Sequence, residues 1–371
     1  MLIAINEKGK MIQAEKELSK RLDYYCPACK SKVYLKVGKV IRPHFAHYHN
    51  RNCQFFSEGE TDEHLRGKKE LADYFKKRGI EVQIEAYLPG LKQRPDLLIL
   101  GSTKKTAIEF QCSPITVEKI SERTEGYLKA DYDVIWILGK SLGQQQFLTA
   151  LQKACLYFSV ASENLLLCSY NIDSQKLRIT YKHQLNDSGK ITYKKKVIAI
   201  DKGEKIQLEN SQWIKRPDRK KNTIKEKQIE LMKRSRQPSH SLLKFLSLVY
   251  KNRENIITIP IEIYQRVPSE WLIKNNPMTW KYLMVLWIES FSPKEIITEK
   301  MLLNWLTEKM KKSEIEFYLL QKISPKIYLK AFVEFLDRLT ESGILKKRND
   351  KSWIYLKALR RFKNYEEKIN S

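Results

Sequence analysis

The chain of 371 residues is long enough for two or three domains, and its 42% hydrophobic residues are enough to build cores. Its formal net charge of +26 favours nucleic acid or an anionic membrane surface as partner. No apolar run reaches the ~18 residues of a membrane span, and the first residues resemble two short strands around a turn at 7–9 more than a secretion signal. These properties favour a cytoplasmic protein that binds nucleic acid.

Composition changes along the chain predict four regions. Residues 1–56 form a small module of short strands with a Cys/His cluster, and residues 57–200 alternate helix and strand. Residues 201–236 form a basic linker, and residues 237–371 are mostly helical. The expected fold class is therefore α/β: a mixed-sheet core, a small zinc-binding β module before it, and a mostly α-helical C-terminal domain.

The first region carries three cysteines and two histidines, at Cys26, Cys29, His44, His47 and Cys53. Two ligand pairs around a strand hairpin are typical of a tetrahedral structural zinc site. Five candidates compete for four positions; the preferred set is Cys26, Cys29, His47 and Cys53, with His44 as the alternate. The other interpretation is a reduced cysteine pair near unrelated histidines.

The second region has the periodicity of a layered α/β domain. Its helices repeat apolar residues every three to four positions, while its strands alternate or are short apolar runs. The predicted elements are a helix over 57–78, strands over 80–88, 97–100 and 106–112, a helix near 116–130, a strand over 133–138, a helix near 144–158, and strands near 165–170, 177–184 and 191–200.

Polar residues on two of these strands suggest a metal site. Asp96 opens one strand, and strand periodicity puts Glu109 and Gln111 on one face of the next, with Phe110 on the other. Burying such groups is costly unless they have partners. A divalent cation, Mg²⁺ or Mn²⁺, prefers carboxylate oxygens and could be held by Asp96 and Glu109. The alternative is an amphipathic hairpin with its acidic residues in solvent.

The preceding helix carries a polar stripe that could complete this site. Glu60, His64 and Lys68 are spaced four residues apart, and Glu63 lies one step round the helix. We count all four as candidate catalytic residues. Glu60 could instead form a capping box with Ser57, and exposed charge is the ordinary state of a surface helix.

Three further residues are candidates for DNA binding near the site. Arg94 comes two residues before Asp96, and Arg123 and Tyr127 are four residues apart on the next helix. Arg123 could contact a phosphate, with Tyr127 supporting it. A surface arginine packed over a half-buried tyrosine is an equally good interpretation.

The C-terminal region carries much of the positive charge. Residues 212–371 hold 34 Lys/Arg against 18 Asp/Glu, a net +16. A helix predicted over 326–342 precedes a hairpin, which suggests a winged-helix-like DNA-binding unit. The basic residues near the wing are Lys346, Lys347, Arg348 and Lys351. The alternative is a plain helical bundle with solvated lysines.

Taken together, the motifs of residues 1–140 resemble the competence protein CoiA family. The motifs are CPAC (26–29), HFAH (44–47), EHLRGKK (63–69), RPDLLIL (94–100), EFQCS (109–113), RTEGY (123–127) and VIWILG (134–139). The resemblance implies a restriction-endonuclease-like core of the PD-(D/E)xK type. It also implies DNA processing and recombination during natural transformation of a bacterium.

Within that resemblance, Asp96 and Glu109 fall on the metal-binding positions of the motif. The general motif ends in lysine, whereas this chain has Gln111, which can hydrogen-bond a water but brings no positive charge. Lys68 could supply that charge. The expected function is a metal-dependent DNA nuclease. Its candidate partners are DNA, with single-stranded and branched DNA among the candidates, and recombination proteins. The alternative is a non-catalytic DNA-binding or recombination-mediator protein that keeps the fold.

Overall fold

The computed structural model describes residues 1–38, 42–48, 53, 61–101, 104–143, 148–186, 190–202, 223–318 and 325–370. Glu60 and residues 203–222, most of the predicted basic linker, lie outside these ranges. The chain divides into two compact units. The first unit consists of Met1–Lys182 and Tyr193–Ser211, and the second unit consists of His183–Thr192 and Gln212–Ser371.

The first unit begins with a small antiparallel sheet of strand order β2-β1-β3-β4-β5. Its strands are β1 (Ile3–Asn6), β2 (Met11–Gln13), β3 (Tyr24–Tyr25), β4 (Lys32–Lys36) and β5 (His44–His47). The predicted turn between the first two strands is confirmed, with Gly9 at φ +75°, a conformation that glycine adopts without strain. Tyr24, Val33 and Phe45 are buried in the core of this module.

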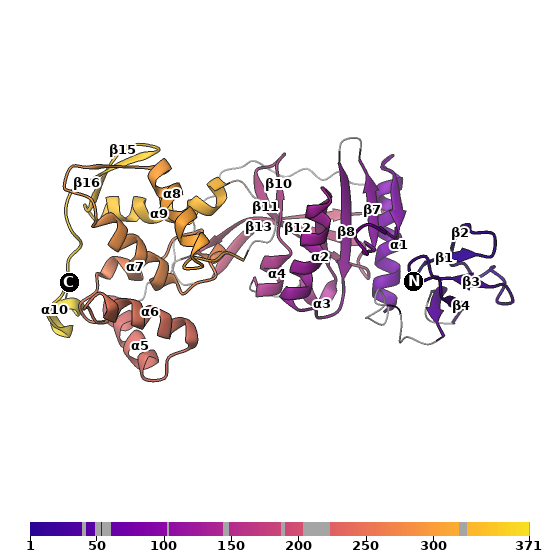
Figure 1. The fold of residues 1–371 in the computed structure, drawn as a ribbon, viewed down its shortest axis with the longest axis horizontal. Coiled ribbons are helices and arrows are strands. Elements are labelled where there is room, and N and C mark those ends of the chain that lie inside the picture. Colours follow the sequence, from indigo (N-terminus) through magenta and orange to yellow (C-terminus); the bar gives the residue numbers. More distant parts are fainter. Residues whose placement is uncertain are drawn as a thin grey trace. The chain divides into compact units, whose positions relative to one another are not determined.

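The rest of this unit is an eight-stranded mixed sheet with helices (Figure 1). The elements are α1 (Asp62–Lys76), β6 (Val82–Ile84), β7 (Leu97–Leu100), β8 (Lys105–Gln111), α2 (Val117–Lys129), β9 (Asp133–Leu138), α3 (Lys140–Gly143), α4 (Ala150–Ala154), β10 (Tyr157–Ser159), β11 (Asn164–Asn171), β12 (Lys176–Leu185) and β13 (Ile191–Ala199). The strand order is β13-β12-β11-β9-β8-β7-β6, and β10 pairs with β11. The β8–β9 and β9–β11 pairs are parallel, whereas β6–β7 and β7–β8 are antiparallel. The predicted α/β class with a mixed sheet is confirmed.

Helices α1 and α2 contact opposite faces of β8. A Cβ atom on Gly67 of α1 would meet the ring of Phe110, so only glycine allows the helix to approach this closely. Glu109, the preceding residue of the strand, bonds to Arg123 and Tyr127 of α2. Since consecutive strand residues point to opposite faces, the two helices must lie on opposite sides of β8.

One predicted helix is wrong in extent. Within the described part of 144–158, only α4 is helical beyond Gly143, and Tyr157–Ser159 forms β10 instead. Phe158 pairs with Leu165 of β11, and this long-range pairing overrides the local preference. The strands predicted near 165–170, 177–184 and 191–200 are confirmed as β11, β12 and β13.

The second unit is mostly helical. Its elements are α5 (Ile224–Arg236), α6 (His240–Lys251), two short 3₁₀ turns, η2 (Ile261–Tyr264) and η3 (Glu270–Leu272), then α7 (Pro277–Ile288), β14 (Ile296–Thr298), α8 (Glu299–Lys311), α9 (Pro325–Glu341), β15 (Leu345–Asn349), β16 (Ser352–Tyr355) and α10 (Tyr365–Ile369). Trp280, Phe332 and Trp353 are fully buried in its core. Among the helices of the described ranges, none combines the length and the apolar character needed to cross a membrane.

The predicted helix and hairpin near the C-terminus are confirmed as α9, β15 and β16. Gly343 follows α9 at φ +68°. The sequence did not predict β14, which pairs with β16 and gives a three-stranded sheet of order β14-β16-β15. The order from α7 to β16 is therefore helix, strand, helix, helix, strand, strand.

The contact between Gly67 and Phe110 can be tested by substitution. We expect Gly67→Ala to lower the free energy of unfolding by about 1–3 kcal/mol through overpacking, although alanine is favoured in a helix by about 1 kcal/mol. Urea denaturation monitored by circular dichroism would measure this change. Gly67→Ala combined with Phe110→Leu should recover part of the loss. An unchanged midpoint for the single variant would show that the helix does not approach the strand this closely.

Candidate active site and metal cluster

Three acidic residues follow one another across neighbouring strands of the large sheet. Leu97 pairs with Ile84 on one side and with Ile108 on the other. The next step in this antiparallel register places Glu85, Asp96 and Glu109 in a row, and the N–H of Glu85 donates to the carbonyl of Asp96 at 2.9 Å. We call these three residues the acidic row.

Asp96 is held from two directions. Its Oδ2 accepts a bond from the N–H of Phe110 at 2.8 Å and lies 3.1 Å from Nε2 of His64. Its Oδ1 lies 3.7 Å from Nζ of Lys68. Burial alone would raise the pKa of Asp96, but His64, Lys68 and the Phe110 N–H outweigh it and hold the pKa below its ordinary value. Asp96 is therefore an anion that the fold neutralises.

Glu85 and Lys68 form a buried ion pair. The two side chains are 1% and 0% exposed, and Nζ of Lys68 lies 2.5 Å from Oε1 of Glu85. The other carboxylate oxygen accepts bonds from the N–H groups of Leu2 and Ile3, at 2.9 and 3.3 Å. Although burial raises the pKa of Glu85, Lys68 and Arg94 bring it well below its ordinary value.

Sequence reasoning missed Glu85. Its place in the alternating segment 80–88 looked like an ordinary solvent-facing strand position. Strand β6 ends at Ile84, and Glu85 takes a positive φ of +52°, which turns its side chain out of the alternation. The signal that could have found it is Lys68, which lies three residues from both Leu65 and Leu71 on the apolar face of α1 and therefore needs a buried anion.

Glu109 is buried and bound by two residues of α2. Its Oε1 accepts bonds from Nη2 of Arg123 and from the hydroxyl of Tyr127, both at 2.5 Å. Burial raises the pKa of Glu109, Arg123 and Tyr127 oppose this rise, and repulsion from Asp96 adds to it. The Arg123 side chain is 37% exposed, so this partner of the buried Glu109 carboxylate also contacts solvent. The predicted Arg123–Tyr127 pair thus converges on a carboxylate.

The remaining predicted residues are held by other contacts. Nε2 of Gln111 donates to the carbonyl of Ser113 at 2.8 Å, and Oε1 of Glu63 accepts from the N–H of Lys140 at 2.7 Å. Arg94 lies 3.6 Å from Glu85. The structure thus groups His64 and Lys68 around Asp96, and groups Arg123 and Tyr127 around Glu109. It holds Glu63 at the end of β9.

In the N-terminal module, Cys26, Cys29, His47 and Cys53 form a compact cluster. One donor atom from each residue lies within 4.8 Å of all the others, and Sγ of Cys29 is 3.3 Å from Nε2 of His47. Tetrahedral zinc with Zn–S distances of ~2.3 Å separates its ligands by about 3.8 Å, so the spacing fits one ion. Burial lowers the pKa of His47, which keeps its imidazole in the neutral form that binds metals.

His44 does not belong to this cluster. It lies three residues before His47 on β5, so the two side chains point to opposite faces of the strand. Its Nδ1 bonds to the carbonyl of Arg42 at 2.9 Å. The preferred four-residue set therefore comes together in space, and the alternate ligand is wrong.

The candidate DNA-binding residues of the second unit are on or beside the C-terminal hairpin. All four are exposed, on β15 or in the turn after it: Lys346, Lys347, Arg348 and Lys351. Nζ of Lys347 lies 3.2 Å from Oδ1 of Asp337, whose carboxylate also receives the indole N–H of the buried Trp353 at 3.4 Å. The hairpin thus presents its cations to solvent while its aromatic residues face the core.

A mixed sheet that carries a row of carboxylates lies in the same unit as a Cys/His cluster. Comparison with known proteins gives the class of this unit as nuclease-like. The family model described as "Competence protein CoiA, nuclease-like domain" matches residues 60–213, and "Competence protein CoiA, N-terminal domain" matches residues 8–56. Together these matches cover more than half of the chain, which belongs to the competence protein CoiA family.

A curated relative gives the same result over a shorter stretch. "Competence protein CoiA" of Bacillus subtilis (strain 168) is 34% identical to this chain over 122 residues. The match spans 33% of this chain and 33% of that protein's length.

The two histidines of β5 provide a matched test of the metal cluster. We expect purified wild-type protein to carry about one equivalent of metal, His47→Ala to lose most of it, and His44→Ala to keep it. Inductively coupled plasma mass spectrometry would measure the metal content. Equal metal content in the two variants, or none in the wild type, would contradict the assignment.

Proposed function

We propose that this protein is a metal-dependent deoxyribonuclease that processes DNA during natural transformation and recombination. The observation that carries the proposal is that Asp96, directly before β7, lies beside Glu109 of β8 within the residues that the nuclease-like family match covers. Phosphodiester hydrolysis by such a site needs a cation between carboxylates and a means of positioning water.

The fit of a cation to this pair rests on their charges. Burial raises the pKa of Glu109 and repulsion from Asp96 adds to this rise, so a divalent ion between the two carboxylates would be favoured. Asp96 and Glu109 would hold Mg²⁺ or Mn²⁺, with the carbonyl of Phe110 as a further oxygen donor. The ion would acidify a bound water and offset the negative charge of the attacked phosphate.

The protein's own groups have distinct roles in this proposal. Lys68, at 3.7 Å from Asp96, supplies the positive charge that the motif lysine normally brings, since Gln111 carries none. His64 orients the Asp96 carboxylate. The Gln111 amide is fixed by its bond to Ser113, which orients it for hydrogen bonding to water.

Arg123 has two partners in the proposal. Its guanidinium bonds to Glu109, and its side chain is exposed enough to reach a phosphate of bound DNA. Tyr127 and Arg94 complete this side of the site: Tyr127 bonds to Glu109, and the carbonyl of Arg94 accepts from Arg123 at 3.3 Å. A cation at Glu109 would compete with Arg123, so its affinity would depend on where that side chain lies.

We further propose that the Cys/His cluster holds a structural Zn²⁺ with four protein ligands, which leaves no open position for chemistry. The domain limits predicted from sequence, 1–56, 57–200, 201–236 and 237–371, are kept as part of this proposal, except that α5 is assigned to the C-terminal domain because Leu231 is buried in its core.

The C-terminal unit is proposed to be a winged-helix-like DNA-binding domain. The element order from α7 to β16 supports this, as does the basic hairpin. Arg348 and Lys351 line an open cavity of about 600 Å³ together with Lys300 at the start of α8. Basic side chains facing phosphates give salt-sensitive binding with little dependence on sequence. Single-stranded or branched DNA and recombination proteins are the proposed partners.

The second candidate function is a non-catalytic DNA-binding or recombination-mediator protein. The observation in its favour is that cationic or hydrogen-bonding protein groups already occupy both carboxylates, while Gln111 replaces the motif lysine.

Cleavage assays separate the two candidates. Wild type, Asp96→Asn and Glu109→Gln would be incubated with single-stranded, duplex and branched DNA, with Mg²⁺ or Mn²⁺. We expect each substitution to reduce the cleavage rate by more than ~100-fold, because it removes charge from the cation site. Glu118→Gln, exposed at the start of α2, is the control. Absence of metal-dependent cleavage in the wild type, with DNA binding intact, would favour the non-catalytic candidate.

The role of the hairpin can be measured by binding at several salt concentrations. We expect Lys346→Gln/Arg348→Gln/Lys351→Gln to weaken binding to duplex DNA and to reduce the slope of log K against log salt by ~0.9 for each phosphate that is no longer neutralised. Lys347 is kept because it bonds to Asp337. Removal of three exposed charges elsewhere in the unit, Lys244→Gln/Lys251→Gln/Lys311→Gln, should have a smaller effect. Equally weakened binding in both triple variants would contradict a specific role of the hairpin.

A further inference from the structure

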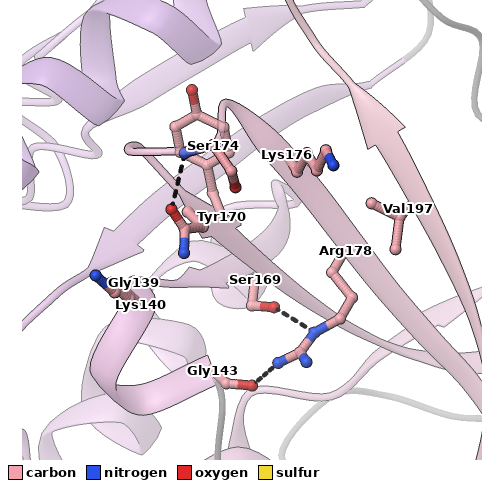
Figure 2. Close-up of a pocket in the computed structure, with 10 residues that line it drawn as sticks. Gly139, Lys140, Gly143, Ser169, Tyr170, Ser174, Lys176, Arg178 and Val197 are labelled. Carbon is pink, nitrogen blue, oxygen red and sulfur yellow. Dashed lines mark hydrogen bonds between the residues drawn. The ribbon is translucent and has the colours of Figure 1, made fainter.

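A cavity of about 150 Å³ lies in the first unit, outside the acidic row. Its wall begins at Gly139 and Lys140, where β9 leads into α3, and continues over the ends of β11 and β12 (Figure 2). A water molecule occupies roughly 30 Å³ in the liquid, so the cavity has room for a small polyatomic ion.

The charged side chains that line this cavity are all cationic. Lys140, Lys176 and Arg178 line it, and its described lining residues include no carboxylate. Lys140 pairs with Asp173 at 2.7 Å, with both side chains more than half exposed, so solvent weakens this pair. Lys176 is exposed as well. The cavity therefore favours an anion.

The cavity is built from fixed donors. The guanidinium of Arg178 bonds to Oγ of Ser169 and to the carbonyl of Gly143, which holds it in place, as Figure 2 shows. A Cβ on Gly143 would collide with Ser169, so this narrow wall requires glycine. Oδ1 of Asn171 accepts two backbone N–H groups, which leaves its amide nitrogen as a donor. Cationic groups together with neutral donors suit a ligand with several acceptor oxygens, such as phosphate.

Backbone hydrogen bonds connect the elements that line this cavity to the elements of the proposed nuclease site. Strands β8, β9 and β11 run parallel, so their carboxyl ends meet at one edge of the sheet. The N–H of Gly139 donates to the carbonyl of Gln111 at 2.7 Å, two residues beyond Glu109. The N–H of Lys140 donates to Glu63 of α1, the helix that also carries His64. Ligands of open α/β sheets bind at this edge.

We propose that this cavity is a phosphate-binding subsite that holds one phosphate group of a nucleic-acid strand. The choice of nucleic acid as the carrier of the phosphate rests on the proposed function; the preference for phosphate does not. A nucleic-acid strand whose phosphate binds there would be held at the edge of the sheet where β8 ends at Gln111.

The test measures binding in buffer without added divalent metal, so it does not depend on cleavage. Fluorescence anisotropy would use 3′-labelled single-stranded oligonucleotides with a 5′-phosphate or a 5′-hydroxyl, and inorganic phosphate as competitor. The variants are Lys140→Gln/Lys176→Gln and the charge-preserving Lys176→Arg. The control is Lys129→Gln, exposed on α2 near the opposite end of β9. Thermal unfolding would verify that each variant is folded.

We expect the double glutamine variant to bind about tenfold more weakly, with a salt slope lower by ~0.7, while Lys176→Arg and Lys129→Gln stay near wild type. If the double variant loses affinity only for the 5′-phosphorylated oligonucleotide, the subsite binds a terminal phosphate. If it loses affinity equally for both oligonucleotides, the subsite binds an internal phosphodiester. If inorganic phosphate competes with the oligonucleotide in wild type but not in the double variant, free phosphate is a sufficient ligand of the subsite.

The proposal would be overturned if the double variant bound every probe with the affinity of wild type, or with the affinity of Lys129→Gln. A wild type that binds neither strand nor phosphate would overturn it as well. If the subsite effect is present but no metal-dependent cleavage is found, the nuclease proposal fails and the subsite stands. The reverse result leaves the nuclease without this subsite.

Discussion

The buried pair of Lys68 and Glu85 is the interaction on which the site depends. Burying two charges costs several kcal/mol per ion unless geometry and additional hydrogen bonds compensate. Here compensation comes from the 2.5 Å contact, from the N–H groups of Leu2 and Ile3, and from the nearby guanidinium of Arg94. The pair therefore ties α1, the end of β6 and the first strand of the N-terminal module together. It also fixes the ammonium group beside Asp96.

The same balance of charge explains how the acidic row can exist inside a fold. Each carboxylate has a cationic neighbour: Lys68 for Glu85 and Asp96, and Arg123 for Glu109. His64 adds a hydrogen-bonding contact to Asp96. His64 and Lys68 come from α1, and Arg123 from α2, on the other face of β8. The site is thus supported by two helices that the sheet separates, and Gly67 sets how near one of them can approach.

Much of this architecture could be predicted from sequence because it is local. Strand alternation predicted the faces of Glu109 and Phe110, and the spacing of cysteines and histidines predicted the cluster. Two of the parts that failed depend on pairing with other strands: Phe158 pairs with Leu165, and β14 acquires a partner only when Trp353 meets Ile297. Glu85 failed for another reason, because its positive φ takes the side chain out of the alternation. His44 could have been rejected on strand periodicity alone.

The bonds from Leu2 and Ile3 to Glu85 have a thermodynamic consequence. The N-terminal module that contains the Cys/His cluster also provides two backbone donors to a buried carboxylate of the acidic row. Folding of the N-terminal module therefore stabilises the buried negative charge of Glu85 in the acidic row. Any ligand that stabilises one favours the other by the same coupling free energy, since linkage is reciprocal. The stability of the Cys/His module and the stability of the nuclease-like sheet are in this sense coupled through Glu85.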